Sequence, residues 1–202
     1  KLGLDYQFYH IDNYFHIAEV LHPKKDEVIL YCNYFGLMDE YVKIVTDRYA
    51  PNIIIDNTQA FFSRPLPEID TFYTCRKFFG VADGAYLYTD KEADFDIPQD
   101  YSSSRMLFLL DRLDKSAEEA FSDYHKSEDT LDYDEIKKMS KITQFIMSSI
   151  CYKSIADRRI SNYTYLHDNL SSSNTLSVDL ERKNVPMVYP FLSEDINLRK
   201  KL

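Results

Sequence analysis

The spacing of apolar residues over the first ninety positions predicts alternating strands and helices. Residues 27–32 form a continuous apolar run of strand length, which is typical of a strand covered on both faces. Between residues 38 and 49 the apolar positions recur every three or four residues, the spacing of a helix with one buried stripe. A second apolar run at 52–56 follows Pro51. Strand, helix and strand in this order predict a βαβ unit and a parallel sheet with a right-handed crossover.

Weaker patterns extend this prediction in both directions. Before residue 27 we expect a strand at 6–11 and a short helix at 14–21, which His22-Pro23 ends. A tight turn at Asp83-Gly84 precedes a further apolar strand at 85–89. The polar stretch that follows gives way to the remaining predicted elements: helices at 105–125, 133–149 and 154–170, a break at 171–174, an extended segment at 185–191 and a partial helix at 194–202.

Composition narrows the classes of function. The chain has 202 residues, a formal net charge of -9 and a pI near 5.0, so it tends to repel nucleic acid and anionic membrane surfaces. Its apolar runs are shorter than a membrane span. The three cysteines are widely spaced, and neither they nor the five histidines show metal-ligand spacing. These features predict a reduced cytoplasmic protein without a metal site.

Two residues of the predicted sheet could bind a cofactor. Asp56 ends an apolar strand, and Lys77 follows about twenty residues later beside the turn at Gly80. An aspartate and a lysine from neighbouring strand ends can flank one flat heteroaromatic ring. Pyridoxal 5'-phosphate (PLP) needs such a pair, because a lysine forms its Schiff base and a carboxylate keeps its ring nitrogen protonated. Spacing alone leaves the ordinary alternatives open, namely a loop-capping aspartate and a solvated lysine.

The sequence around Asp56 and Lys77 is more specific than their spacing. Residues 56–59 read Asp-Asn-Thr-Gln, residues 74–78 read Thr-Cys-Arg-Lys-Phe, and Asp83-Gly84 opens the next strand. In this order the run from Asn52 to Thr89 resembles the DegT/DnrJ/StrS-type sugar aminotransferases, which are PLP-dependent enzymes of fold type I. The resemblance continues more weakly over both flanks, as if the chain were the central part of a longer protein.

The resemblance implies a role for four residues. Lys77 is the catalytic residue that binds the cofactor and then moves a proton between substrate and cofactor carbons. Asp56 pairs with the ring nitrogen, Gln59 contacts the ring oxygen, and Thr74 binds the phosphate. Gln59 could equally be a packing amide, and Thr74 could simply be a strand former. We also expect the neighbouring rings of Phe78 and Phe79 to shield the Lys77 amine from water.

The resemblance also implies a fold and a reaction. The expected fold is a three-layer α/β/α domain with a mostly parallel sheet, of the PLP-transferase large-domain type. Residues 1–100 would be the remainder of that domain, 101–174 a helical link, and 175–202 the start of a small C-terminal domain. The expected reaction is amino transfer from a small amino donor to a nucleotide-linked keto sugar for polysaccharide synthesis, in a cytoplasmic homodimer.

Some residues depart from the family pattern, and two other functions stay open. Ile55 stands where relatives often have an acidic residue, Ala82 where many have proline, and Phe61-Phe62 are expected to crowd the site. These departures leave the substrate undecided. The alternatives are other PLP chemistry on the same fold, such as elimination or sulfur transfer, and a non-catalytic scaffold.

Overall fold

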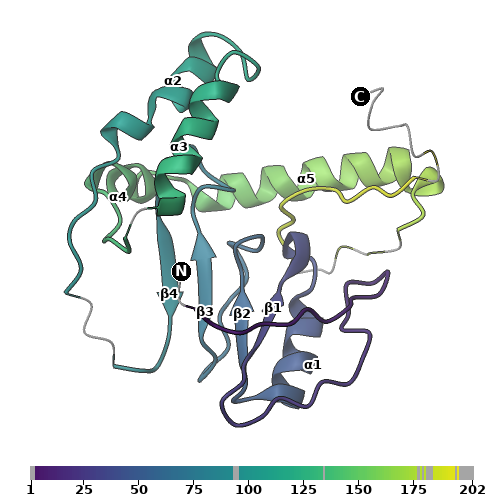
Figure 1. Cartoon of the computed structure of the whole chain (residues 1–202). Helices are drawn as coiled ribbons and strands as arrows, with labels where there is room; N and C mark the ends of the chain where they lie inside the picture. The colour runs from purple at the N-terminus through teal and green to yellow at the C-terminus, as the bar shows by residue number, and fades with distance from the viewer. Residues whose placement is uncertain are drawn as a thin grey trace.

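The chain folds as an α/β protein around a small open sheet (Figure 1). The computed structural model describes residues 3–92, 96–133, 135–176, 178, 180, 184–193 and 195. The strands are β1 (Ile29–Cys32), β2 (Ile53–Asp56), β3 (Thr71–Thr74) and β4 (Ala85–Tyr88). The helices are α1 (Asp39–Tyr49), α2 (Leu107–Asp114), α3 (Phe121–Tyr133), α4 (Lys141–Ser148) and α5 (Tyr152–Leu170).

The sheet is mostly parallel, as predicted. Its order is β1-β2-β3-β4, with β1, β2 and β3 parallel to one another and β4 antiparallel to β3. Helix α1 is the crossover between β1 and β2, as the helical spacing predicted. The chain returns into β4 through Gly84, whose φ of 108° lies in the region that favours glycine. Because β1 and β2 are parallel, their carboxyl ends lie side by side at one end of the sheet, beside the turn that follows β3.

One face of the sheet carries the core. Alternate strand residues point to the same face, which here brings Ile29 and Tyr31 beside Ile53 and Ile55. Helix α1 covers these side chains with its own apolar stripe: Val42, Val45 and Tyr49. Each such buried side chain contributes about 1.5–3 kcal/mol relative to exposure. This packing fixes where the carboxyl ends of β1 and β2 lie.

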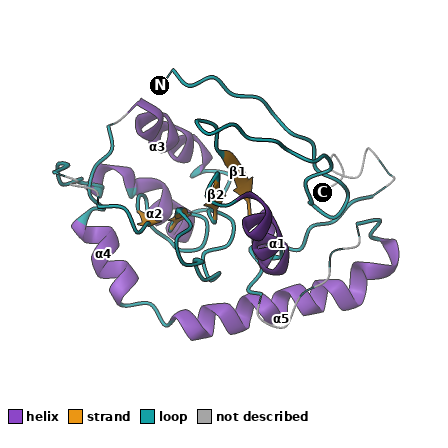
Figure 2. Ribbon diagram, turned by 90° about the horizontal axis from the view of Figure 1, so that it is seen from below, coloured by secondary structure: helices purple, strands orange, loops and turns teal. Residues whose placement is uncertain are grey.

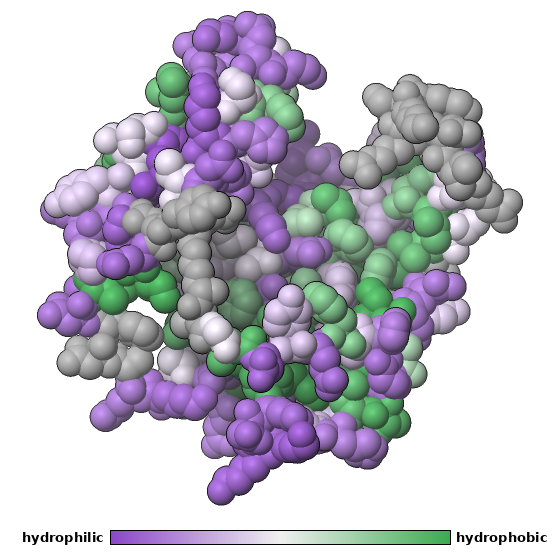
Figure 3. Space-filling model, in the orientation of Figure 1, coloured by the Kyte–Doolittle hydropathy of each residue, from purple (hydrophilic) through white to green (hydrophobic). Residues whose placement is uncertain are grey.

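The opposite face is only partly covered. Leu30 on β1 is 51% exposed and Leu87 on β4 is 53% exposed. An irregular stretch near the N-terminus crosses this face (Figures 1 and 2). Within this stretch, the Tyr9 hydroxyl donates to the Leu30 carbonyl at 2.9 Å. Apolar side chains show among the polar ones on this side (Figure 3). The second helical layer of the expected three-layer domain is absent from the part of the chain that the structure describes.

The predictions for residues 6–21 were wrong. This stretch holds one isolated bridge, between Ile11 and Ile17, rather than a strand and a helix. The carboxylate of Asp12 accepts from the backbone N–H groups of Tyr14 and His16 at 2.8 and 2.9 Å. A short polar side chain that binds nearby backbone N–H groups in this way favours a turn over a helix.

The helices after residue 100 also differ from prediction. The single helix expected at 105–125 is two helices, α2 and α3, which pack against each other and break at Lys115, where φ is -121° and ψ is -109°. Helix α4 begins only after Ser140, whose side chain accepts from the Thr143 N–H, so the helix expected at 133–149 is shorter. Helix α5 confirms the one at 154–170. Residues 185–191, which we expected to be an extended segment, lie in no helix or strand, and the partial helix expected at 194–202 lies outside the described residues apart from Asp195.

Candidate cofactor site

The structure brings Asp56 and Lys77 together. Asp56 ends β2 and lies in register between Cys32 on β1 and Phe72 on β3. Its Oδ1 accepts from the Thr58 N–H at 2.7 Å, and the Lys77 Nζ donates to the Thr58 hydroxyl at 3.1 Å. Both predicted residues therefore meet at Thr58. The bond to Oδ1 is the loop-capping role that we left open for Asp56, and it still leaves Oδ2 for a ligand.

The thiol of Cys32 lies close enough to both charges to be affected by them. Burial first, and then the negative charge of Asp56, raise the pKa of Cys32 to about 12, although the positive charge of Lys77 opposes them. The pKa of Tyr34 is also raised, by burial first and then by Cys32 and Asp56. Asp56 and Lys77 thus act on the same small volume at the end of β1.

This arrangement makes Cys32 a reporter of the site. At pH 9, we expect Asp56→Asn to speed alkylation of Cys32 by iodoacetamide and Lys77→Ala to slow it, because only the thiolate reacts. Peptide mass spectrometry measures the two rates. Cys75 is a control in the same molecule, since burial and then Asp83, rather than Asp56, raise its pKa to about 12. Unchanged alkylation of Cys32 in both variants would show that the two charges lie away from the thiol.

The expected shielding of Lys77 by aromatic rings was wrong. Lys77 is exposed, whereas Phe78 and Phe79 are each only 7% exposed. The Phe79 ring packs on Phe61 at 4.7 Å between centroids, and Phe62 belongs to the same cluster. The tight turn at residues 75–80 directs the lysine and the two rings to different sides. The expected crowding of the site by Phe61 and Phe62 is therefore also wrong, because both belong to this cluster.

Thr74 lies on the same face of the sheet as Asp56. Asp56 is in register with Phe72, and Thr74 is two positions further along β3. Strand geometry places the two Cα atoms about 8 Å apart, which a small ring with a phosphate arm can span. Thr74 lines a hollow of about 290 Å³ that Arg76 also lines. Its hydroxyl makes only a long contact of 3.5 Å, to the Gly84 carbonyl.

The surroundings of Thr74 are of mixed charge. Arg76 forms an ion pair with Glu128 on α3. Asp83, Asp100 and Glu135 also line the hollow. Lys137 is a second cationic residue of the lining, so an anion here would meet the Thr74 hydroxyl, the Arg76 guanidinium, which already has a carboxylate partner, and Lys137 among three acidic residues.

Gln59 has the packing role that the sequence left open. Its side-chain carbonyl accepts from the Phe35 N–H at 3.1 Å, which joins the loop after β2 to the loop after β1. Gly36 in the latter loop has a φ of +70°, and a Cβ there would lie 2.8 Å from the Val185 carbonyl and 3.2 Å from that of Gln59. These loops and the segment at residue 185 are closely packed.

The close packing at Gly36 predicts a clear effect of one methyl group. We expect Gly36→Ala to lower the free energy of unfolding by about 1–3 kcal/mol, because the new Cβ strains the backbone and forces backbone atoms apart. Urea unfolding measures this. Gly80→Ala is the matched control, since an added Cβ at Gly80 meets nothing within 4 Å. Equal effects of the two substitutions would contradict the close approach.

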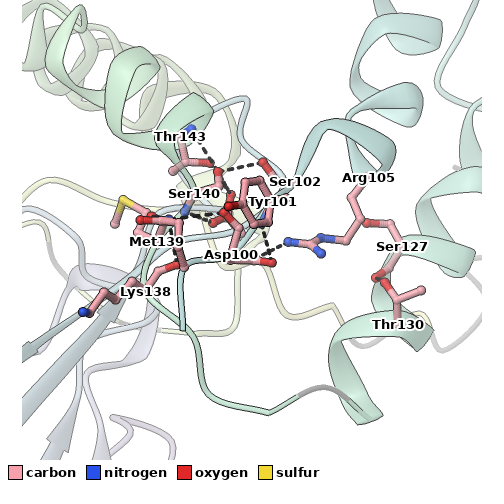
Figure 4. A network of polar contacts seen from close by, with 12 residues as sticks. Asp100, Tyr101, Ser102, Arg105, Ser127, Thr130, Lys138, Met139, Ser140 and Thr143 are labelled. Carbon is pink, nitrogen blue, oxygen red and sulfur yellow. Dashed lines mark hydrogen bonds and ion pairs between the residues drawn. The ribbon is translucent and has the colours of Figure 1, made fainter. Parts of the chain in front are cut away.

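Sequence reasoning missed two features near the site. Thr58 was not singled out, although the side chain of an aspartate commonly accepts from the backbone N–H two residues further on. Asp83 was read only as a turn residue, but it is 5% exposed and accepts from the Ser140 N–H at 2.7 Å and the Ser140 hydroxyl at 2.9 Å. Figure 4 shows the polar network around Ser140, which also includes Ser102 and Thr143.

Comparisons with known proteins leave the family undecided. No model of a protein family matches the chain, and no curated protein or solved structure is significantly similar to it. Within the described residues, no group of three histidine, cysteine or acidic side chains could hold a metal ion. None of the helices described is both long enough and apolar enough to cross a bilayer.

Proposed function

We propose that the chain is an aminotransferase-like protein that uses PLP, with Lys77 as its catalytic residue. The observation that carries the proposal is the meeting of Asp56 and Lys77 at Thr58, with Lys77 Nζ 3.1 Å from the Thr58 hydroxyl. The resemblance at residues 52–89 supplies the cofactor and the reaction class. The residues fit the cofactor, because an exposed amine, a partly free carboxylate and a hydroxyl lie around one edge of the sheet.

Each residue would have a distinct task. PLP, when bound, supplies an electron sink for the substrate carbon. Asp56 would hold the proton on the ring nitrogen through the oxygen that Thr58 does not occupy. Lys77 is exposed, so its amine can reach both the cofactor aldehyde and the substrate, and it would move the proton between their carbons. Thr74 would contact the phosphate, with Arg76 near it.

The reaction and its setting come from the resemblance. An amino donor would give its nitrogen to a nucleotide-linked keto sugar for polysaccharide synthesis, in a cytoplasmic homodimer of PLP-transferase type. Gln59, whose carbonyl oxygen already accepts from Phe35, could contact the cofactor only through its amide NH2 group.

The proposal is tested with the chain and with a longer form that includes any flanking residues its gene encodes. We expect PLP to give a visible absorption band, borohydride to fix it on Lys77, and glutamate with a keto sugar to give 2-oxoglutarate and an amino sugar. Elimination products or persulfide would instead support the lyase or sulfur-transfer alternative. If neither form gave a band, the proposal would be wrong and the scaffold alternative would stand.

A further inference from the structure

A half-buried arginine of α5, Arg159, lies against the turn that carries Lys77. The guanidinium carbon of Arg159 lies 4.5 Å from the centroid of the Phe78 ring, close enough for a cation–π interaction. Its Nη2 also donates to the Phe78 carbonyl at 3.4 Å. Phe78 is the residue next to Lys77, so Arg159 contacts both the backbone of the turn and the ring that anchors it.

The same side chain reaches a second segment. The Arg159 Nη1 donates to the Met187 carbonyl at 2.8 Å, and the Met187 N–H donates to the Phe35 carbonyl at 2.7 Å. Phe35 is also the residue whose N–H binds Gln59. A continuous series of contacts therefore joins the turn after β3, the segment at residue 187, and the loops after β1 and β2. The turn after β3 carries Lys77, the loop after β1 carries Tyr34, and the loop after β2 carries Thr58, at which Asp56 and Lys77 meet.

The position of Arg159 has an energetic disadvantage that a surface residue would avoid. Burial lowers the pKa of Arg159 from its usual value, and its Nε is buried without a hydrogen-bond partner among the described residues. Unsatisfied buried donors are uncommon and destabilising. A planar guanidinium can bind two carbonyls and stack on a ring at the same time, which lysine cannot do.

We propose that Arg159 is the positioning residue for Lys77, holding the turn so that the amine lies at Thr58 beside Asp56. The role assigned to the Lys77 amine rests on the proposed function, whereas the restraint of the turn does not. The contacts of Arg159 are with Phe78 and Met187 and not with Asp56, Thr58 or Lys77, so it acts on the amine through the turn.

The first measurement needs no cofactor. In Arg159→Met we expect amide hydrogen exchange at residues 76–80 to rise about tenfold or more, the factor for losing one hydrogen bond from a charged donor. Exchange in α1 should stay unchanged. The matched control is Arg158→Met, because Arg158 is the exposed neighbour on α5. Unchanged exchange at 76–80 in Arg159→Met would overturn the inference.

The second measurement concerns the amine itself. We expect covalent attachment of PLP to Lys77 to slow about tenfold in Arg159→Ala and to recover with added methylguanidinium, which a general loss of stability would not do. Faster exchange with an unchanged attachment rate would overturn the positioning role. Absence of attachment in the unsubstituted chain would refute the proposed function, and hydrogen exchange alone would then decide whether the turn is restrained.

A milder variant covers the case in which these substitutions unfold the chain. Arg159→Lys keeps the charge but can bind only one of the two carbonyls, so we expect exchange to rise in one of the two segments. Global unfolding of all three variants would also overturn the inference, because a local restraint leaves the packing of α1 on the sheet intact.

Discussion

We expect Lys77→Ala to abolish the covalent attachment of PLP while leaving the fold intact. Lys77 is exposed, and its side chain makes one hydrogen bond, to Thr58, so its removal should change the free energy of unfolding by less than about 0.5 kcal/mol. The loss of attachment should nevertheless be complete, since Lys77 is the residue proposed to supply the amine of the Schiff base. Absorption spectra and peptide mass after borohydride reduction measure this.

The control for this substitution is another exposed lysine. Lys25 lies in a turn before β1, and Lys25→Ala should leave both the visible band and the mass of the modified peptide unchanged. Asp56→Asn should keep the attachment but shift the band, because the neutral amide no longer holds a proton on the ring nitrogen. A band of equal strength in Lys77→Ala would remove this lysine from the mechanism.

The largest loss of stability should come from Asp83→Ala. Asp83 accepts from the Ser140 N–H, from the Ser140 hydroxyl and from the Thr143 hydroxyl, all of them buried at the start of α4. Removal of the carboxylate leaves these donors without an acceptor, at about 1–3 kcal/mol for each unsatisfied group. Ser140 and Thr143 can rotate toward each other or toward Ser102, so we expect a total of about 3–4 kcal/mol. Thermal and urea unfolding measure the change.

The matched control is a carboxylate in an exposed ion pair. Asp157 pairs with Lys153 on α5 while its side chain is 59% exposed, and Asp157→Ala should change stability by less than about 0.5 kcal/mol. Asp83→Asn should lie between the two, since it keeps one acceptor but places an amide against hydroxyl and N–H donors. An effect of Asp83→Ala below about 1 kcal/mol would mean that the network at α4 contributes little to the fold.

The sheet and its crossover helix were predictable because their signals are local. The apolar runs that became β1 and β2 and the stripe of α1 between Val42 and Tyr49 each lie within one short window of sequence. The turn at Asp83-Gly84 could likewise be predicted. The hydrogen-bond partners of Asp83 could not, because Ser140 lies 57 residues further along the chain. The failure at residues 6–21 has a local cause in Asp12, whose side chain replaces a helical hydrogen bond with a turn.

The site was predictable to a similar extent. The proximity of Asp56 and Lys77 follows from strand ends that meet at one edge of a parallel sheet. The side to which Lys77 points depends on the turn at 75–80 and on the packing of Phe78 and Phe79 against Phe61, which no pattern of residue types encodes. The role of Arg159 was hidden for the same reason, because it acts on Phe78 from 81 positions away.

The partly covered face of the sheet has a practical consequence for handling the protein. β1 and β4 are the edge strands of the sheet, and Leu30 on β1 and Leu87 on β4 are half exposed. Edge strands with free backbone groups and apolar neighbours readily pair with other chains. Concentrated solutions should therefore self-associate and bind hydrophobic dyes, and dilute samples with mild detergent are the better starting point for spectroscopy.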